Sequence, residues 1–194
     1  MIIVGGASIL LNYGFRINSD DIDCTDKSGV LMNDIINQVA EKHNLPKHWI
    51  NTDFVHTKSY SSKLDQYSVF YKSYGYGALE VRTIKDEYLI AMKIVSARKY
   101  KNDYSDIYGI LGECRKANKS ISFEMVESAL INLYSDISIA DKTALEFTKK
   151  IIENPESIQY EQIISKEAVH ADDVIEMKND LKLDSKDIEY ILKK

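Results

Sequence analysis

MIIVGGAS at residues 1–8 and SDDIDC at residues 19–24 are the two stretches that decide the predicted fold. The first predicts a short apolar strand, a Gly-Gly turn and a helix, and the second predicts another strand. Because alternate residues of a strand point to the same side, Asp21 and Asp23 share one face of that second strand. Together, a glycine turn and two neighbouring carboxylates favour metal-assisted phosphoryl or nucleotidyl transfer.

Asp21 and Asp23 are the first candidates for chemistry. Mg²⁺, or Mn²⁺ in its place, binds oxygen ligands and is commonly held by one or two carboxylates together with substrate phosphates. The pair therefore predicts a metal site with a catalytic role. The alternative is a solvated turn that is simply rich in Asp, but the apolar Ile22 between the carboxylates and the Gly-Gly turn upstream favour the site.

The glycine turn is the second candidate. A helix that begins at Gly5 and Gly6 offers unpaired backbone N–H groups to a phosphate. Ser8 and Ser19 add hydroxyls that can meet phosphate oxygens. The structural alternative is an ordinary strand-to-helix turn that needs a positive φ, with each serine acting as a cap or turn residue.

The rest of the chain predicts an α+β protein, with a mixed sheet flanked by helices and then an all-helical carboxyl-terminal region. We place the domain boundary after residue 116, which gives a mixed domain over 1–116 and a helical domain over 117–194. After the second strand, we expect a helix at 30–44, a hairpin at 67–84, and helices at about 86–99, 104–116, 122–134, 137–154 and 158–170. One or two short helices are expected over 171–194.

Glu80 is the candidate for a third carboxylate. It lies on the second strand of the expected hairpin, where it shares a face with Ala78 and Arg82. If this strand lies beside the one that carries Asp21 and Asp23, Glu80 can act as a metal ligand or a base. A solvent-facing strand residue is an equally good interpretation.

Lys93 is the single charge within an otherwise apolar run at 88–95. A helix that is apolar on all sides is typically buried, and a buried ammonium group requires a partner. Asp103 and Asp106 in the next segment are the expected partners. Such a pair either ties two helices together or holds Lys93 beside nucleotide phosphates, and both can be true.

Composition and charge exclude several protein classes. The 194 residues carry a net charge of -5, with 44% hydrophobic and 28% charged residues, which is unlike a protein that coats nucleic acid through bulk charge. Cys24 and Cys114 are far apart, so we expect reduced thiols. No window approaches the ~20 apolar residues of a membrane span, and the start lacks a signal-peptide pattern. We therefore expect a cytoplasmic protein with no membrane partner.

These residues together resemble the nucleotidyltransferase superfamily that includes DNA polymerase beta. More narrowly, the chain looks like the bacterial nucleotidyltransferase families around the AbiEii-type toxins. The resemblance covers roughly residues 1–115, and Gly6 stands where many relatives carry serine. In chain order, the motifs that carry it are Gly5-Gly6, Arg16, Ser19, Asp21-Ile22-Asp23, Ala91-Met92-Lys93, Asp103 and Asp106-Ile107.

The resemblance implies a magnesium-dependent transfer of a nucleoside monophosphate from an NTP to an acceptor. It implies that Asp21 and Asp23 bind the metal, and it adds Lys93 and Asp106 to the catalytic residues, with Glu80 as the unassigned third carboxylate. It favours an RNA or tRNA 3′ end as acceptor and an antitoxin protein as partner. The expected nucleotide-binding residues are Gly5, Gly6, Ser8, Arg16 and Ser19.

Two other functions stay open. A small-molecule nucleotidyltransferase, such as one that modifies an antibiotic, would be indicated by a deep acidic pocket, whereas a basic rim of Arg98, Lys101 and Arg115 would indicate RNA. A non-catalytic relative that binds a partner, as an antitoxin does, is the other alternative. The intact pair Asp21 and Asp23 argues against it.

Overall fold

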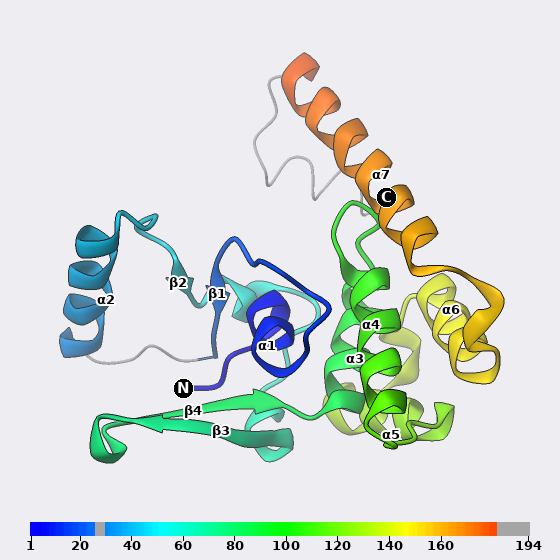
Figure 1. Ribbon diagram of the computed structural model, residues 1–194, viewed down its shortest axis with the longest axis horizontal. Coiled ribbons are helices and arrows are strands. Elements are labelled where there is room, and N and C mark those ends of the chain that lie inside the picture. Colours follow the sequence, from blue (N-terminus) through cyan, green and yellow to red (C-terminus); the bar gives the residue numbers. More distant parts are fainter. Residues whose placement is uncertain (26–29, 182–194) are drawn as a thin grey trace.

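The computed structural model describes residues 1–25 and 30–181 and has a mixed α+β architecture (Figure 1). The strands lie on one side of the molecule with α1 and α2, and helices α3 to α6 gather on the other side. The helices are α1 (Gly5–Asn12), α2 (Val30–His43), α3 (Asp86–Ser96), α4 (Asp103–Lys116), α5 (Phe123–Tyr134), α6 (Lys142–Glu153) and α7 (Tyr160–Leu181). The strands are β1 (Ile22–Asp23), β2 (Ile50–Asn51), β3 (Ser68–Tyr74) and β4 (Leu79–Ile84).

The amino-terminal residues join two small sheets. Strand β1 pairs with β2 in parallel, and β3 pairs with β4 as the expected antiparallel hairpin. The expected strand at 2–4 is reduced to two isolated bridges, because Ile2 pairs in parallel with Arg82 of β4 and Ile3 pairs antiparallel with Cys24 after β1. This short segment therefore lies between the two sheets and delivers the chain directly into α1.

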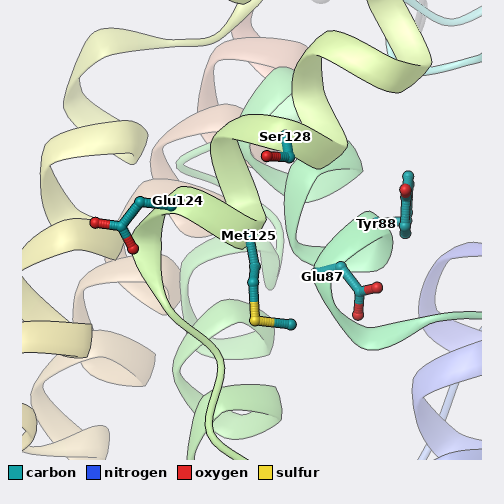
Figure 2. Close-up of a pocket in the computed structure, with 5 residues that line it drawn as sticks. All are labelled: Glu87, Tyr88, Glu124, Met125 and Ser128. Atoms are coloured by element: carbon teal, nitrogen blue, oxygen red, sulfur yellow. The ribbon is translucent and has the colours of Figure 1, made fainter.

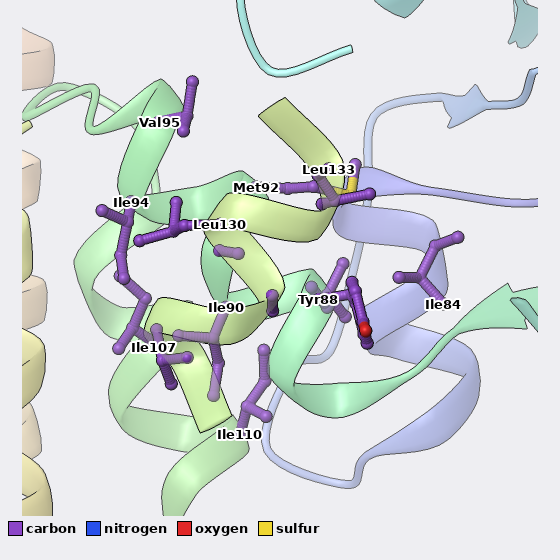
Figure 3. Packing of buried hydrophobic residues seen from close by; sticks show 14 of the residues in the cluster. Ile84, Tyr88, Ile90, Met92, Ile94, Val95, Ile107, Ile110, Leu130 and Leu133 are labelled. Carbon is purple, nitrogen blue, oxygen red and sulfur yellow. The ribbon is translucent and has the colours of Figure 1, made fainter. Parts of the chain in front are cut away.

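The main hydrophobic core lies among the helices (Figure 3). Helix α3 is buried from Tyr88 to Val95, as its apolar sequence predicts, and it packs against α4, α5 and α6. Ile107 and Ile110 of α4 and Leu130 of α5 fill the space between these helices. The expected domain boundary after residue 116 falls inside this core, because α3 and α4 precede it and α5 and α6 follow it.

Two helix predictions in the second half need correction. The expected helix at 137–154 starts later, at Lys142, because the Asp141 carboxylate accepts a hydrogen bond from Ala144 N (2.9 Å) and caps the helix there. The two helices expected at 158–170 and 171–194 are one continuous helix, α7, since no Gly or Pro interrupts residues 160–181. The remainder of that prediction, residues 182–194, lies outside the described part of the chain.

Within residues 1–25 and 30–181, none of the helices has both the length and the apolar composition needed to cross a membrane.

Candidate functional site

The two glycines at the start of α1 lie against other residues of the predicted site. Gly5 has φ +62°, and a Cβ atom there would lie 3.0 Å from Asp23 Oδ2. A Cβ atom at Gly6 would lie 2.9 Å from both the Arg16 guanidinium and Ser19 Oγ. The structure thus brings these five residues together, and the absence of a Cβ at Gly5 and Gly6 permits this close approach to the helix start.

The two carboxylates after the loop differ in their surroundings. Asp21 is exposed and its Oδ2 accepts a hydrogen bond from Asn51 Nδ2 (2.9 Å), while Ser19 Oγ donates to its backbone oxygen (2.9 Å). Asp23 is half-buried. Burial, and then the charge of Asp21, raise the pKa of Asp23 to about 6. Two carboxylates that repel one another in this way form a donor set that a cation would stabilise.

The donor set fits a magnesium ion that is completed by a substrate. Among the described residues, no three His, Cys, Asp or Glu side chains form a group that could hold a metal ion. Mg²⁺ in nucleotide sites usually needs only one or two carboxylates, because substrate phosphates and water supply its other ligands. Asp21 and Asp23 are the residues that would hold it.

Lys93 sits in a buried network of charges, which confirms the expected pairing. Its Nζ lies 2.9 Å from Asp103 Oδ1 and 2.7 Å from Asp106 Oδ2, so both predicted partners bind it. The side chains of the two carboxylates are 0% and 2% exposed. Burial alone would lower the pKa of Lys93, but Asp103 and Asp106 raise it above its ordinary value. The two carboxylates thus stabilise the charged form of Lys93.

Two arginines complete this network. Arg16 Nη1 donates to both carboxylate oxygens of Asp106 (3.0 and 2.8 Å), and Arg16 Nε donates to Asn18 O (2.9 Å). Arg98 donates to Asp103 Oδ2 from both its backbone N (2.9 Å) and its Nε (3.0 Å). Three cations thus share two carboxylates of the first turn of α4. Arg16 links this network to the glycine turn, because its guanidinium lies beside Gly6.

Glu80 and Ser8 are not brought to this place. Glu80 is exposed and forms an ion pair with Arg82 Nη1 (3.0 Å). Arg82 is the residue of β4 that bridges to Ile2, and Glu80 lies two residues before it, toward the hairpin turn. Asp23 lies on the opposite side of that bridge from Glu80, because its backbone oxygen accepts a hydrogen bond from Val4 N. Ser8 is fully buried in α1. Its hydroxyl cannot reach a phosphate in this conformation.

Three residues near the site had not been assigned a role there. Asn51 binds Asp21, and a signal for it existed, because the carboxyl ends of adjacent parallel strands meet at one edge of a sheet. For Arg98, the sequence suggests only a place in a basic rim. Glu167 of α7 reaches the start of α4, and nothing in the local sequence could indicate a contact across about sixty residues.

The basic rim expected for RNA does not form as one patch. Arg98 and Lys101 precede α4, and Arg115 lies at its far end. A helix of 14 residues is about 20 Å long, which separates these charges.

Two hollows lie outside the network. One, of about 270 Å³, lies between α3 and α5, and none of the predicted site residues lines it; its lining residues are Glu87, Tyr88, Glu124, Met125 and Ser128 (Figure 2). The other, of about 540 Å³, borders α4 and the start of α7 and is acidic and aromatic; it is lined by Tyr108, Glu156, Ile158, Gln159, Tyr160 and Glu161.

The second hollow adjoins the charge network. Tyr160 stacks on Tyr108 and contacts Phe15, the residue before Arg16. Burial, and then the charges of Asp106 and Glu167, raise the pKa of Tyr160.

Comparisons with family models, with curated proteins and with solved structures found no match for this chain.

Proposed function

We propose that this protein is a metal-dependent nucleotidyltransferase that moves a nucleoside monophosphate from an NTP to an acceptor. The observation that carries the proposal is the close approach of Gly5 and Gly6 to Asp23, Arg16 and Ser19. It combines a helix start that has no side-chain cap, a pair of carboxylates and a set of anchored cations. This combination suits a triphosphate and its metal better than any neutral ligand.

The residues of the site have separate tasks in this proposal. The N–H groups at the start of α1 and the Ser19 hydroxyl bind phosphate oxygens, and Arg16 and Lys93 supply positive potential from fixed positions. Asp21 and Asp23 hold Mg²⁺, which neutralises charge on the phosphates and lowers the pKa of the attacking hydroxyl when it is bound. In the reaction, the acceptor oxygen forms a bond to the α-phosphorus, and the bond to the leaving pyrophosphate breaks.

The acceptor is the less constrained part of the proposal. The sequence resemblance favours an RNA or tRNA 3′ end. An amine-bearing small molecule is the second candidate, because the hollow beside Tyr108 and Tyr160 carries Glu156 and Glu161. Carboxylates and aromatic faces both attract cations, and such a lining repels the phosphates of RNA.

The test is incubation of the protein with each NTP labelled at the α-phosphate, in the presence of Mg²⁺ and either total RNA or a panel of aminoglycosides, which carry both amines and acceptor hydroxyls. We expect one acceptor class to become labelled. Asp21→Ala or Asp23→Ala should abolish labelling without loss of the fold. Asp20→Ala is the matched control, because Asp20 is a neighbouring exposed carboxylate with no assigned role.

Equal labelling by wild type and Asp23→Ala would contradict the assignment of the site. Binding of NTP without transfer to either acceptor class would favour the non-catalytic alternative.

A further inference from the structure

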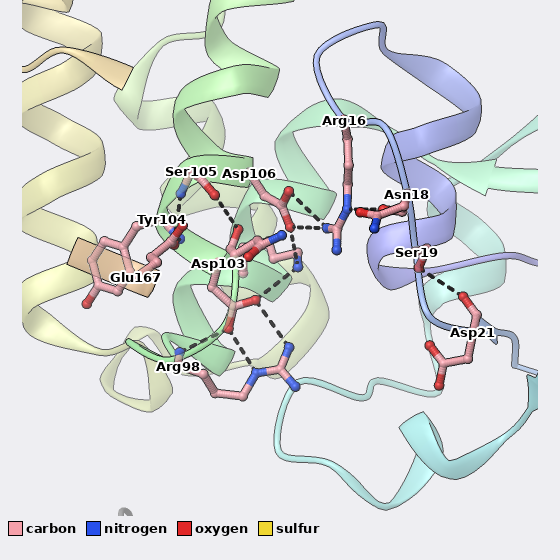
Figure 4. A network of polar contacts seen from close by, with 12 residues as sticks. Arg16, Asn18, Ser19, Asp21, Arg98, Asp103, Tyr104, Ser105, Asp106 and Glu167 are labelled. Carbon is pink, nitrogen blue, oxygen red and sulfur yellow. Dashed lines mark hydrogen bonds and ion pairs between the residues drawn. The ribbon is translucent and has the colours of Figure 1, made fainter. Parts of the chain in front are cut away.

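The start of α4 is closed by a residue from another helix. Glu167 of α7 accepts hydrogen bonds through its Oε1 from Tyr104 N (2.9 Å) and Ser105 N (3.1 Å), and it is only 6% exposed (Figure 4). The residue at the N-cap position of α4, Asn102, forms no side-chain cap. Glu167 therefore performs in α4 the task that a residue of the same helix normally performs.

Glu167 caps the first turn of α4, and this turn carries the two carboxylates that bind the cations of the candidate site. Asp103 and Asp106 lie in it, next to the two N–H groups that bind Glu167. Asp103 holds Lys93 and Arg98, and Asp106 holds Lys93 and Arg16. A shift of this turn would therefore move each cation that the candidate site draws from this network.

An ionised carboxylate at Glu167 is disfavoured by its burial and by a neighbouring negative charge. Burial, and then the charge of Asp106, raise the pKa of Glu167 to about 6, although hydrogen bonds from Ser105 and Tyr104 oppose this shift. A neutral side chain would avoid the repulsion from Asp106. The carboxylate instead gives strong, charge-assisted bonds to a helix start, which fix the position of that turn.

A second contact of α7 reaches the other side of the same network. Tyr160 lies against Phe15 with their ring centroids 6.3 Å apart, and Phe15 immediately precedes Arg16. Phe15 also packs against the backbone of α4, where a Cβ at Gly109 would lie 2.4 Å from its ring. Helix α7 thus contacts both elements that meet in the Arg16–Asp106 pair.

We propose that Glu167 is a positioning residue through which α7 sets the placement of Asp103 and Asp106, and with them of Arg16 and Lys93. The consequence for catalysis rests on the proposed nucleotidyl transfer, whereas the positioning itself does not. Glu167 touches neither substrate nor metal in this account. It acts by holding the first turn of α4 in the position from which Asp103 and Asp106 orient Arg16 and Lys93.

The test compares Glu167→Ala and Glu167→Gln with Asp141→Ala in the full chain. The Asp141 carboxylate caps α6 through Ala144 N (2.9 Å), so its loss removes a similar bond from a helix that holds no site residue. Glu167→Gln keeps an acceptor oxygen and is the conservative variant. The first readout is the ¹H–¹⁵N NMR spectrum of the Lys93 ammonium and Arg16 guanidinium groups, which needs no turnover.

We expect these signals to shift or broaden in Glu167→Ala, to stay close to wild type in Glu167→Gln, and to be unchanged in Asp141→Ala. We expect the transfer rate of Glu167→Ala to fall about tenfold or more, since a misplacement of about 1 Å can cost on the order of 100-fold. Asp141→Ala should keep the wild-type rate.

Unchanged Lys93 and Arg16 signals in Glu167→Ala, in a protein that remains folded, would overturn the positioning role whatever the rate. Shifted signals would uphold the role even if wild type transferred no nucleotide, in which case only the proposed reaction would fail. If Glu167→Ala does not fold, Glu167→Gln and Glu167→Asp decide: wild-type signals in the shorter Asp variant would overturn the role, and displaced signals would support it.

Discussion

At the scale of single residues, Asp23 has the more perturbed carboxylate of the pair that we propose to hold the metal. It is half-buried, faces the charge of Asp21 and has a pKa of about 6. A carboxylate with a raised pKa destabilises the folded protein whenever it is ionised. The folded state binds the Asp23 proton more tightly than the unfolded state does. The contribution of Asp23 to the free energy of unfolding is therefore favourable at low pH and is lost as the pH rises through about 6.

We therefore predict that Asp23→Asn stabilises the metal-free protein at pH 8, by on the order of 1 kcal/mol once solvent screening is taken into account. The advantage should vanish near pH 4, where Asp23 is protonated in wild type. Chemical denaturation across this pH range measures it, with Asp20→Asn as the control. A less stable Asp23→Asn protein at pH 8 would mean that the carboxylate supports the fold.

Lys93 gives the second prediction at this scale. Removal of one partner from a buried ion pair typically costs about 3–5 kcal/mol. We expect Lys93→Met to lower the free energy of unfolding by about 3 kcal/mol, near the low end of this range. The loss is limited because Asp103 remains paired with Arg98 and Asp106 remains paired with Arg16. Urea denaturation measures the loss, and the exposed Lys101→Met should show almost none. If the two variants lost stability equally, the network would have no stabilising role.

At the scale of elements, α4 connects the parts of the candidate site. Its first turn holds the cations, and its middle receives Phe15 at Gly109. The Lys93 partners could be predicted, because a lone charge in an apolar helix must be paired and the next helix offered two carboxylates. The Glu167 cap could not, because a contact between distant helices depends on packing that no local pattern encodes. The two interpretations of Glu80 stayed open for the same reason, since strand order determines which carboxylates meet.

The two glycines in α4 offer a matched pair of variants. We predict that Gly109→Ala destabilises the protein by about 1–3 kcal/mol, because the new methyl group would overlap the Phe15 ring. Gly112→Ala has open space around it and should stabilise the protein by about 0.5–1 kcal/mol through helix propensity. Thermal unfolding of both variants checks this. Equal effects at the two positions would show that Phe15 does not pack closely on α4.

At the scale of the whole molecule, the candidate site lies where the strand half meets the helical half. The glycine turn, Arg16 and Asp23 come from the first half, whereas Lys93 comes from α3 and the carboxylates that anchor the cations come from α4. The sequence predicted the mixed α+β character and most helices, because hydrophobic periodicity is local. It did not predict that the strand at 2–4 would shrink to two bridges, because strand pairing depends on tertiary contacts. Nor did it predict that the last helix would continue unbroken, although no Gly or Pro interrupts residues 160–181.

The most direct measurement of the central claim is a calorimetric titration of each NTP into the protein, with Mg²⁺ and again with a chelator. The account predicts one binding site that requires Mg²⁺ and is lost in the Asp21→Ala/Asp23→Ala double variant. At a hundredfold excess over Kd, that ligand should also stabilise the fold by about 2.7 kcal/mol. Binding that is indifferent to Mg²⁺ or to loss of the two carboxylates, or no binding of any NTP, would contradict the account.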